Sequence, residues 1–179
     1  MIDRFWKLVE KIVEFIIGGF FKLIGKEFSK EKSRALMEFI KFGIVGVSNT
    51  LISYVIYVAA LKGFQIADIL EKYDYIIAQV IAFILSVLWS FYWNNKYVFT
   101  LEDGESRSIF KSLMKTYVSY SFTGLFLNNV LLYLWVEIIG ISEYIGPLLN
   151  LFISVPVNYI INKFWAYRKE RVSEVAEDE

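Results

Sequence analysis

The stretch from Tyr75 to Trp93 reads YIIAQVIAFILSVLWSFYW and contains no charged residue. About 20 residues of helix suffice to cross the hydrocarbon layer of a bilayer, and aromatic residues at both edges are typical of anchors at the headgroup level. The stretch from Tyr117 to Val136 has the same character. With two further apolar segments, the predicted spans lie near 39–61, 75–93, 117–136 and 144–162. We expect an all-α integral membrane four-helix bundle.

The composition of the whole chain agrees with a membrane protein and excludes several functional classes. Of 179 residues, 56% are hydrophobic and 18% aromatic, above the roughly 45–50% apolar share of soluble domains. The 19 basic and 19 acidic residues balance, which leaves no basic field to hold nucleic acid. Cysteine and histidine are absent, and with them the commonest metal ligands and the usual general base. We expect no nucleic-acid partner, no catalytic residue, no metal and no cofactor, so the protein is not expected to be an enzyme.

The distribution of basic residues predicts the orientation of the chain. Of the 19 Lys and Arg residues, only Lys62 and Lys72 fall in the loops that follow the first and third predicted spans. Positive residues near span ends are retained on the cytoplasmic side. We therefore expect a multi-pass protein of the cell membrane with both termini in the cytoplasm.

The segment 1–34 differs from the spans because its polar residues recur at three- and four-residue intervals. This pattern is typical of an amphipathic helix, and the segment lacks the uninterrupted apolar core of a secretory signal. We interpret it as a helix in the cytoplasmic interface; the alternative is a helix packed against a partner subunit. The predicted organisation is this interfacial helix, a four-span domain over 35–169 and an acidic cytoplasmic tail over 170–179.

The chain also contains an internal repeat. Each half has two predicted spans and ends in a related block: SFYWNNKYVF at 90–99 and NYIINKFWAY at 158–167, in which Asn94 matches Asn162. Upstream, Asn49 in the first span matches Asn128 in the third. An even number of spans per half predicts two parallel repeats related by an axis along the membrane normal.

Polar residues inside and at the ends of the spans are the candidate binding residues. Within the spans, Asn49, Asn128 and Asn158 could line a polar crevice, because an amide donates and accepts hydrogen bonds without carrying charge. The structural alternative is interhelical hydrogen bonding. At the span ends, donors at the headgroup level could bind a lipid phosphate, or could be ordinary topology anchors. These span-end residues are Asn94, Asn95, Lys96, Asn162, Lys163 and Arg168.

Taken with the stretch FIKFGIVGVSNT at 39–50, the two span-end blocks resemble those of the GtrA family of small four-span membrane proteins, over roughly 36–169. The resemblance implies a role in surface-glycan pathways, moving a polyprenyl-phosphate-linked sugar or its carrier lipid between leaflets. Similar four-span modules also occur as the membrane part of polyprenyl-phosphate glycosyltransferases.

The leading hypothesis is therefore a lipid-sugar translocator, or flippase, whose span ends capture the phosphate. Since four helices enclose little volume, we expect a homodimer or higher homo-oligomer, with Gly43, Gly46, Gly124 or the amphipathic helix at the contacts. The alternative is a non-transporting scaffold that recruits a glycosyltransferase partner and presents polyprenyl phosphate to it. A small multidrug exporter is a third hypothesis, disfavoured because no Asp or Glu lies within an apolar core.

Overall fold

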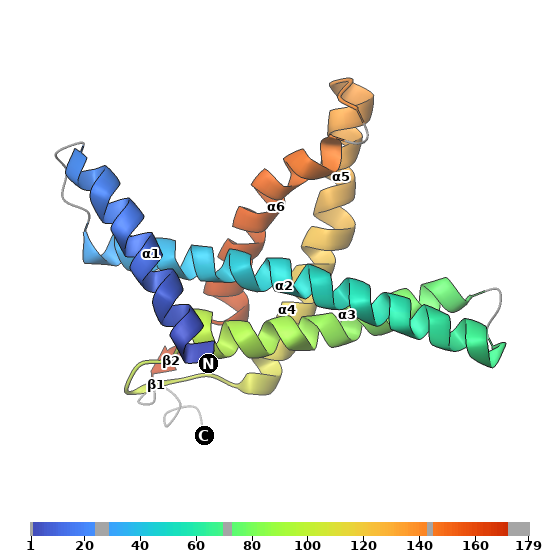
Figure 1. Cartoon of the computed structure of the whole chain (residues 1–179), viewed down its shortest axis with the longest axis horizontal. Helices are drawn as coiled ribbons and strands as arrows, with labels where there is room; N and C mark the ends of the chain where they lie inside the picture. The colour runs from blue at the N-terminus through green and yellow to red at the C-terminus, as the bar shows by residue number, and fades with distance from the viewer. Residues whose placement is uncertain (1, 24–28, 70–72, 143–144, 172–179) are drawn as a thin grey trace.

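The computed structural model describes residues 2–23, 29–69, 73–142 and 145–171 (Figure 1). In this part of the chain the fold is helical, apart from a two-residue ladder. The elements in chain order are α1 (Ile2–Leu23), α2 (Lys30–Ala67), α3 (Asp74–Trp93), η1 (Asn94–Val98), β1 (Glu105–Ser106), α4 (Ile109–Ser121), η2 (Phe122–Leu127), α5 (Asn128–Tyr133), η3 (Leu134–Ile138), α6 (Gly146–Ile161), η4 (Asn162–Ala166) and β2 (Glu170–Arg171), where η denotes a π-helical turn.

The π-helical turns continue the helices before them, so the described chain forms five helical rods. The rods are α1, α2, α3 with η1, the run from α4 to η3, and α6 with η4. This confirms the predicted all-α class.

Helix α2 is longer than its predicted span at both ends. Its N-terminus is capped by Ser29, whose Oγ accepts from the backbone N–H of Lys32 at 3.3 Å. Its C-terminus is set by Asp68, which adopts a left-handed conformation with φ of 53°. The Ser29 cap places residues 30–34 in the first turns of α2, ahead of the predicted span.

Within the described residues, three helices are long and apolar enough to cross a membrane: Glu31–Ala67, Asp74–Val98 and Ile109–Ile138. They contain the first three predicted spans. The fourth predicted span coincides with α6, where Asn150, Pro156 and Asn158 interrupt the apolar sequence. The structure thus has three to four candidate spans.

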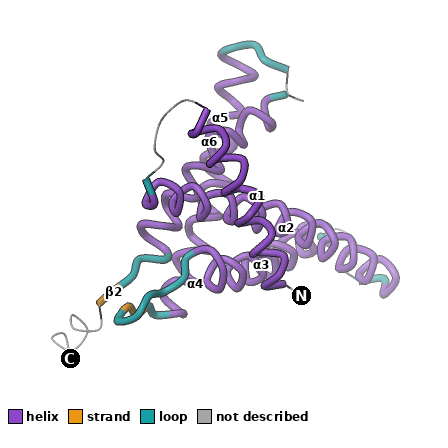
Figure 2. The backbone as a smooth tube through the Cα atoms, turned by 60° about the vertical axis from the view of Figure 1, so that its left-hand side comes forward, coloured by secondary structure: helices purple, strands orange, loops and turns teal. Residues whose placement is uncertain are grey.

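The spans form two hairpins that share one end and diverge from it. Helices α2 and α3 run side by side, whereas α5 and α6 rise away from them (Figures 1 and 2). We call the shared end the base; it contains η1, η4 and the antiparallel β1–β2 ladder (Figure 1). The predicted four-helix bundle is therefore not closed along its length. Aromatic and amide contacts join the hairpins at the base, Phe83 and Tyr117 meet farther along, and other facing residues line a cavity.

The buried core also lies at the base, where α1, α2, η1 and η4 meet. Its cluster consists of Trp6, Phe42, Val45, Phe91, Val98, Phe99, Ala166 and Tyr167. The rings of Phe99 and Tyr167 are stacked with centroids 4.6 Å apart. These two residues end the two similar sequence blocks at 90–99 and 158–167, so the core joins the ends of both hairpins.

The two span ends have the same local backbone geometry. In η1 the backbone N–H of Phe99 donates to the carbonyl of Asn94 at 2.8 Å. In η4 the N–H of Tyr167 donates to the carbonyl of Asn162 at 2.7 Å. Each bond closes a wider i to i+5 turn, and such π-turns are frequent at functional sites.

Candidate functional site

A cavity of about 1000 Å³ lies between the two hairpins; we call it the groove. Among the described residues that line it there is no Asp, Glu, Lys or Arg. The structure brings the predicted residues Asn49, Asn128 and Asn158 to this one cavity. The groove is lined by Phe42, Gly43, Gly46, Val47, Asn49, Thr50, Leu51, Ser53, Tyr54, Tyr57, Gln79, Phe83, Ser86, Val87, Tyr120, Thr123, Gly124, Asn128, Leu151, Ser154, Val155 and Asn158.

Two amides of the groove keep an unused acceptor. The Oδ1 atoms of Asn49 and Asn128 are buried and have no hydrogen-bond partner among the described residues. A buried polar atom without a partner is costly and is rare in folded proteins. Oδ1 of Asn158, by contrast, accepts from Ser119 Oγ at 2.9 Å. Among these three amides, Asn49 and Asn128 are therefore the ones whose Oδ1 is unused in the structure.

Three glycines keep the groove wide. Gly43, Gly46 and Gly124 line it, and a Cβ added at any of them would meet no atom within 4 Å. Within one copy of the chain these glycines do not serve close helix packing. They leave space between the hairpins instead.

The amide of Asn94 lies in a hydrogen-bond network at the base. Asn94 is fully buried, and its Nδ2 donates to Ser90 Oγ at 3.1 Å and to the hydroxyl of Tyr120 at 3.3 Å. The hydroxyls of Ser90 and Tyr120 are 2.6 Å apart. Since Tyr120 belongs to α4, this network ties the first hairpin to the second.

Asn162 occupies the matching place in the second hairpin. It is also fully buried, and its Nδ2 donates to Ser119 Oγ at 3.0 Å and to Oδ1 of Asn158 at 2.9 Å. Ser119 is the neighbour of Tyr120 on α4, so the two networks meet on adjacent residues. Asn94 and Asn162 are predicted to offer donors at the headgroup level; in the structure their Nδ2 groups donate inside the protein, and their buried Oδ1 atoms have no partner among the described residues.

Arg107 fastens the ends of both hairpins. Its guanidinium donates to the carbonyl of Phe99 at 2.9 Å, to the carbonyl of Tyr167 at 3.1 Å and to Oδ1 of Asn95 at 2.6 Å. Partial burial lowers the pKa of Arg107 from its ordinary value. The contact with Arg107 also means that Oδ1 of the predicted binding residue Asn95 is already used within the protein.

The three predicted cations lie at the surface of the base with different partners. Lys163 Nζ donates to Glu38 Oε2 at 2.6 Å. For Lys96 and Arg168, both exposed, no carboxylate of the described residues lies within ion-pair distance. Lys96 rests instead against the rings of Tyr92 and Tyr97. Lys163 and Arg168 line one pocket of about 380 Å³, together with Lys169; we call it the base pocket.

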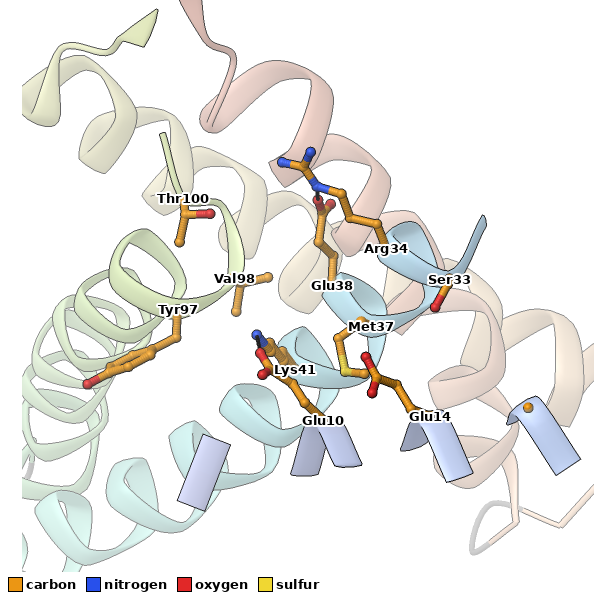
Figure 3. A pocket seen from close by; sticks show the side chains of 11 residues that line it. Glu10, Glu14, Ser33, Arg34, Met37, Glu38, Lys41, Tyr97, Val98 and Thr100 are labelled. Carbon is orange, nitrogen blue, oxygen red and sulfur yellow. Dashed lines mark hydrogen bonds and ion pairs between the residues drawn. The ribbon is translucent and has the colours of Figure 1, made fainter. Parts of the chain in front are cut away.

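Another pocket at this end of the protein, of about 560 Å³, lies between α1 and α2 (Figure 3). Its two cations already have acidic partners: Lys41 pairs with Glu10 of α1, and Arg34 pairs with Glu38 (Figure 3). With Glu14 also present, this pocket is less suited to an anion than the one beside Lys163 and Arg168.

Several residues at the site are not predicted from the sequence. Arg107 enters the sequence analysis only as one of the basic residues that predict the membrane orientation, and Ser119 and Tyr120 belong to no recognisable motif. Glu38 precedes the first predicted span and pairs with Lys163, which is 125 positions away. For Glu38 and Arg107 a usable signal was their charge close to a span end, where an unpaired charge is costly.

Comparisons with known proteins place these features in context. Residues 41–167 match the family described as GtrA/DPMS, transmembrane domain. The chain is 30% identical over 130 residues to a dolichol-phosphate mannosyltransferase of Pyrococcus furiosus, a match covering 71% of this chain and 33% of that protein. The chain thus spans about a third of that relative. It is 27% identical over 128 residues to the uncharacterized membrane protein YwcD of Bacillus subtilis, covering 72% of this chain and 94% of YwcD. No solved structure matches the chain.

Proposed function

Since the chain belongs to the GtrA/DPMS transmembrane domain family, as its sequence blocks predicted, we propose that it moves a polyprenyl-phosphate-linked sugar, or the carrier lipid, between leaflets. The family makes it a multi-pass integral membrane protein linked to polyprenyl-phosphate sugar pathways. The observation that carries the proposal is the groove, an uncharged cavity between the two hairpins in which amide and hydroxyl groups lie among apolar side chains.

In the proposed mechanism each part of the site handles one part of the lipid. Lys163 and Arg168 at the base pocket attract the phosphate. The sugar follows the groove past Asn158, Asn128 and Asn49, and the isoprenoid tail stays in the surrounding lipid. No covalent bond forms or breaks. The base and both termini face the cytoplasm in this proposal, because basic residues gather at that end.

The groove and the base pocket are separate in this structure, which gives the mechanism a conformational step. Along α6 and η4, Asn158 lines the groove, Asn162 belongs to the buried network, and Lys163 lines the base pocket. For a sugar to pass from the base pocket to the groove, the hydrogen bonds around Asn94 and Asn162 must break. The π-helical turns that begin at these two residues are where this change is easiest, because their hydrogen-bonding is already irregular.

The internal repeat and the assembly of the protein are part of the proposal. The shared geometry of η1 and η4 supports two parallel repeats. Hairpins that pack together near the base leave the groove incompletely enclosed, which supports a homodimer or higher homo-oligomer. Native mass spectrometry of protein released from nanodiscs tests this assembly, and a purely monomeric spectrum would contradict it.

Liposomes that contain only this protein and a polyprenyl-phosphate-linked hexose test the translocation proposal. An impermeant reagent counts the lipid exposed outside over time. We expect exposure faster than in protein-free liposomes, with the acceleration lost in Gly46→Leu, whose side chain fills the groove. Gly63→Leu is the matched control, since Gly63 lies on the same helix outside the groove and also has free space around it.

A scaffold is the second candidate, favoured by the mannosyltransferase match. Because this chain aligns with about a third of that relative, it could serve as the membrane part of a two-component enzyme system. Exposure at the protein-free rate, together with retained lipid binding, would overturn translocation and favour the scaffold. In that case a glycosyltransferase should co-purify with the chain.

A further inference from the structure

We propose that the groove selects a sugar headgroup without an ionised substituent, and so discriminates a neutral hexose from a uronic acid or an amino sugar. This inference rests on the translocation function proposed above. It concerns the sugar alone, because every candidate lipid carries the same phosphate.

The distribution of charge is the first observation that carries it. Charged residues line the two pockets at the base, among them Glu10, Glu38, Lys41 and Lys163. Among the described residues lining the groove none is charged. An ionised sugar that enters from the base would move away from the charged side chains there. In the groove, where the dielectric constant is low, it would then have no opposite charge to pair with.

The unused acceptors of the groove are the second observation. Asn49 and Asn128 each hold a buried Oδ1 atom to which no donor of the described chain bonds. A sugar hydroxyl carries the O–H donor that these atoms lack and can accept from a neighbouring donor as well. An ionised carboxylate offers only lone pairs, so it cannot supply the donor that these two Oδ1 atoms lack. An ammonium can donate to them, but no carboxylate in the groove balances its charge.

The hydroxyl-bearing residues around these amides complete a surface suited to neutral sugars. Ser53, Tyr54 and Tyr57 on α2 face the same cavity, and Gln79 joins them from α3. Each of these groups can donate and accept hydrogen bonds while remaining uncharged. The groove therefore offers hydrogen bonds to hydroxyls at many places and a strong charged contact at none.

The test compares three polyprenyl-phosphate lipids that differ only in the sugar: a hexose, the corresponding uronic acid and the corresponding amino sugar. Each is placed in liposomes with the wild-type protein at neutral pH, and outward exposure is followed with an impermeant reagent. We expect both ionised sugars to move slower than the hexose by roughly a factor of ten or more, since an unpaired charge within a membrane is costly. Equal rates, or a faster ionised sugar, would overturn the selectivity and leave translocation intact. If no lipid moves faster than in protein-free liposomes, translocation fails and the inference fails with it.

A substitution that places one charge in the groove gives a second readout. Asn128→Asp should speed the amino sugar several-fold relative to the hexose and slow the uronic acid further, because a carboxylate now faces the sugar. Asn129→Asp is the matched control: Asn129 does not line the groove, and its amide bonds to the Leu125 carbonyl of its own helix. The control should leave the order of the three rates unchanged. The same shift in both variants would contradict the role of the groove. If Asn128→Asp fails to fold, the wild-type comparison decides.

Discussion

Arg107 lies over the ring of Tyr167, with its guanidinium carbon 5.1 Å from the ring centroid, while its Nη1 donates to the Tyr167 backbone carbonyl at 3.1 Å. The same guanidinium donates to the carbonyl of Phe99, which ends the matching turn of the other hairpin. One side chain from the loop between the hairpins therefore holds both of their ends. Arg is suited to this because its planar fork has five donors in fixed directions.

Arg107→Lys should destabilise the base although it keeps the positive charge. A lysine cannot reach both carbonyls and Oδ1 of Asn95 together, so acceptors lose their partner at a cost of about 2 kcal/mol. In a protein of this size that lowers the Tm by about 4–8 °C. Thermal unfolding in nanodiscs measures the effect, with Lys111→Ala on exposed α4 surface as a control that should leave Tm unchanged. Equal Tm values for wild type and Arg107→Lys would show that Arg107 does not hold the base.

Asn162→Ala should destabilise the second hairpin by about 1–3 kcal/mol, because it leaves Ser119 Oγ and Oδ1 of Asn158 short of a donor in a buried site. Asn129→Ala removes the same side chain from an exposed position and should have a much smaller effect. Chemical unfolding of both variants in detergent gives the comparison. A larger loss for Asn129→Ala would contradict the structural role of Asn162.

Trp6→Ala should release α1 from the base. Trp6 is buried and stacks on Tyr97 with ring centroids 5.5 Å apart, whereas Phe15 on the same helix is 84% exposed. The chain has no cysteine, so spin labels at Lys11→Cys and Lys111→Cys report the distance from α1 to α4 directly. We expect a broad distance distribution in Trp6→Ala and a narrow one in wild type and Phe15→Ala. A narrow distribution in Trp6→Ala would mean that other contacts hold α1.

Glu38→Gln should strengthen binding of polyprenyl phosphate several-fold. The substitution frees the Lys163 ammonium from its carboxylate partner at the mouth of the base pocket. Glu31→Gln removes the same charge from an exposed position of the same helix and controls for net charge. Binding to protein in nanodiscs, titrated with the lipid, measures both. Equal affinities for the two variants would argue against a phosphate site at Lys163.

The β1–β2 ladder should weaken in acid. Its Glu105 accepts a hydrogen bond from Lys169 and from the backbone N–H of Glu102, and both lower the pKa of Glu105 from the ordinary value of 4.5. Because the pKa is lowered in the folded state, the stabilisation is present above pH 4.5 and is lost as the pH falls through the lowered value. An NMR titration of the carboxyl should give a lower pKa in wild type than in Lys169→Gln. Equal values would show that the ion pair is not formed in solution.

The helical class and the positions of the spans could be predicted from the sequence because an uncharged apolar run has few alternatives in a membrane. Tyr75–Trp93 must satisfy its backbone internally once it enters hydrocarbon, and a helix does so without any partner. The correspondence between Asn94 and Asn162 could also be predicted, because the two residues occur in similar sequence blocks. Their burial could not be predicted, because it depends on which other segments pack over them.

What the sequence by itself determined is therefore local: which segments are helical and apolar, and which polar residues lie within or at the ends of them. Only the tertiary structure decided which of these residues meet. Asn49, Asn128 and Asn158 come from three different helices and share a groove because the hairpins join at the base and diverge beyond it. Glu38 and Lys163 pair across 125 positions for the same reason. Such contacts depend on the relative placement of whole helices, which is set by the sum of many packing and hydrogen-bond contacts at the base and by no single stretch of residues.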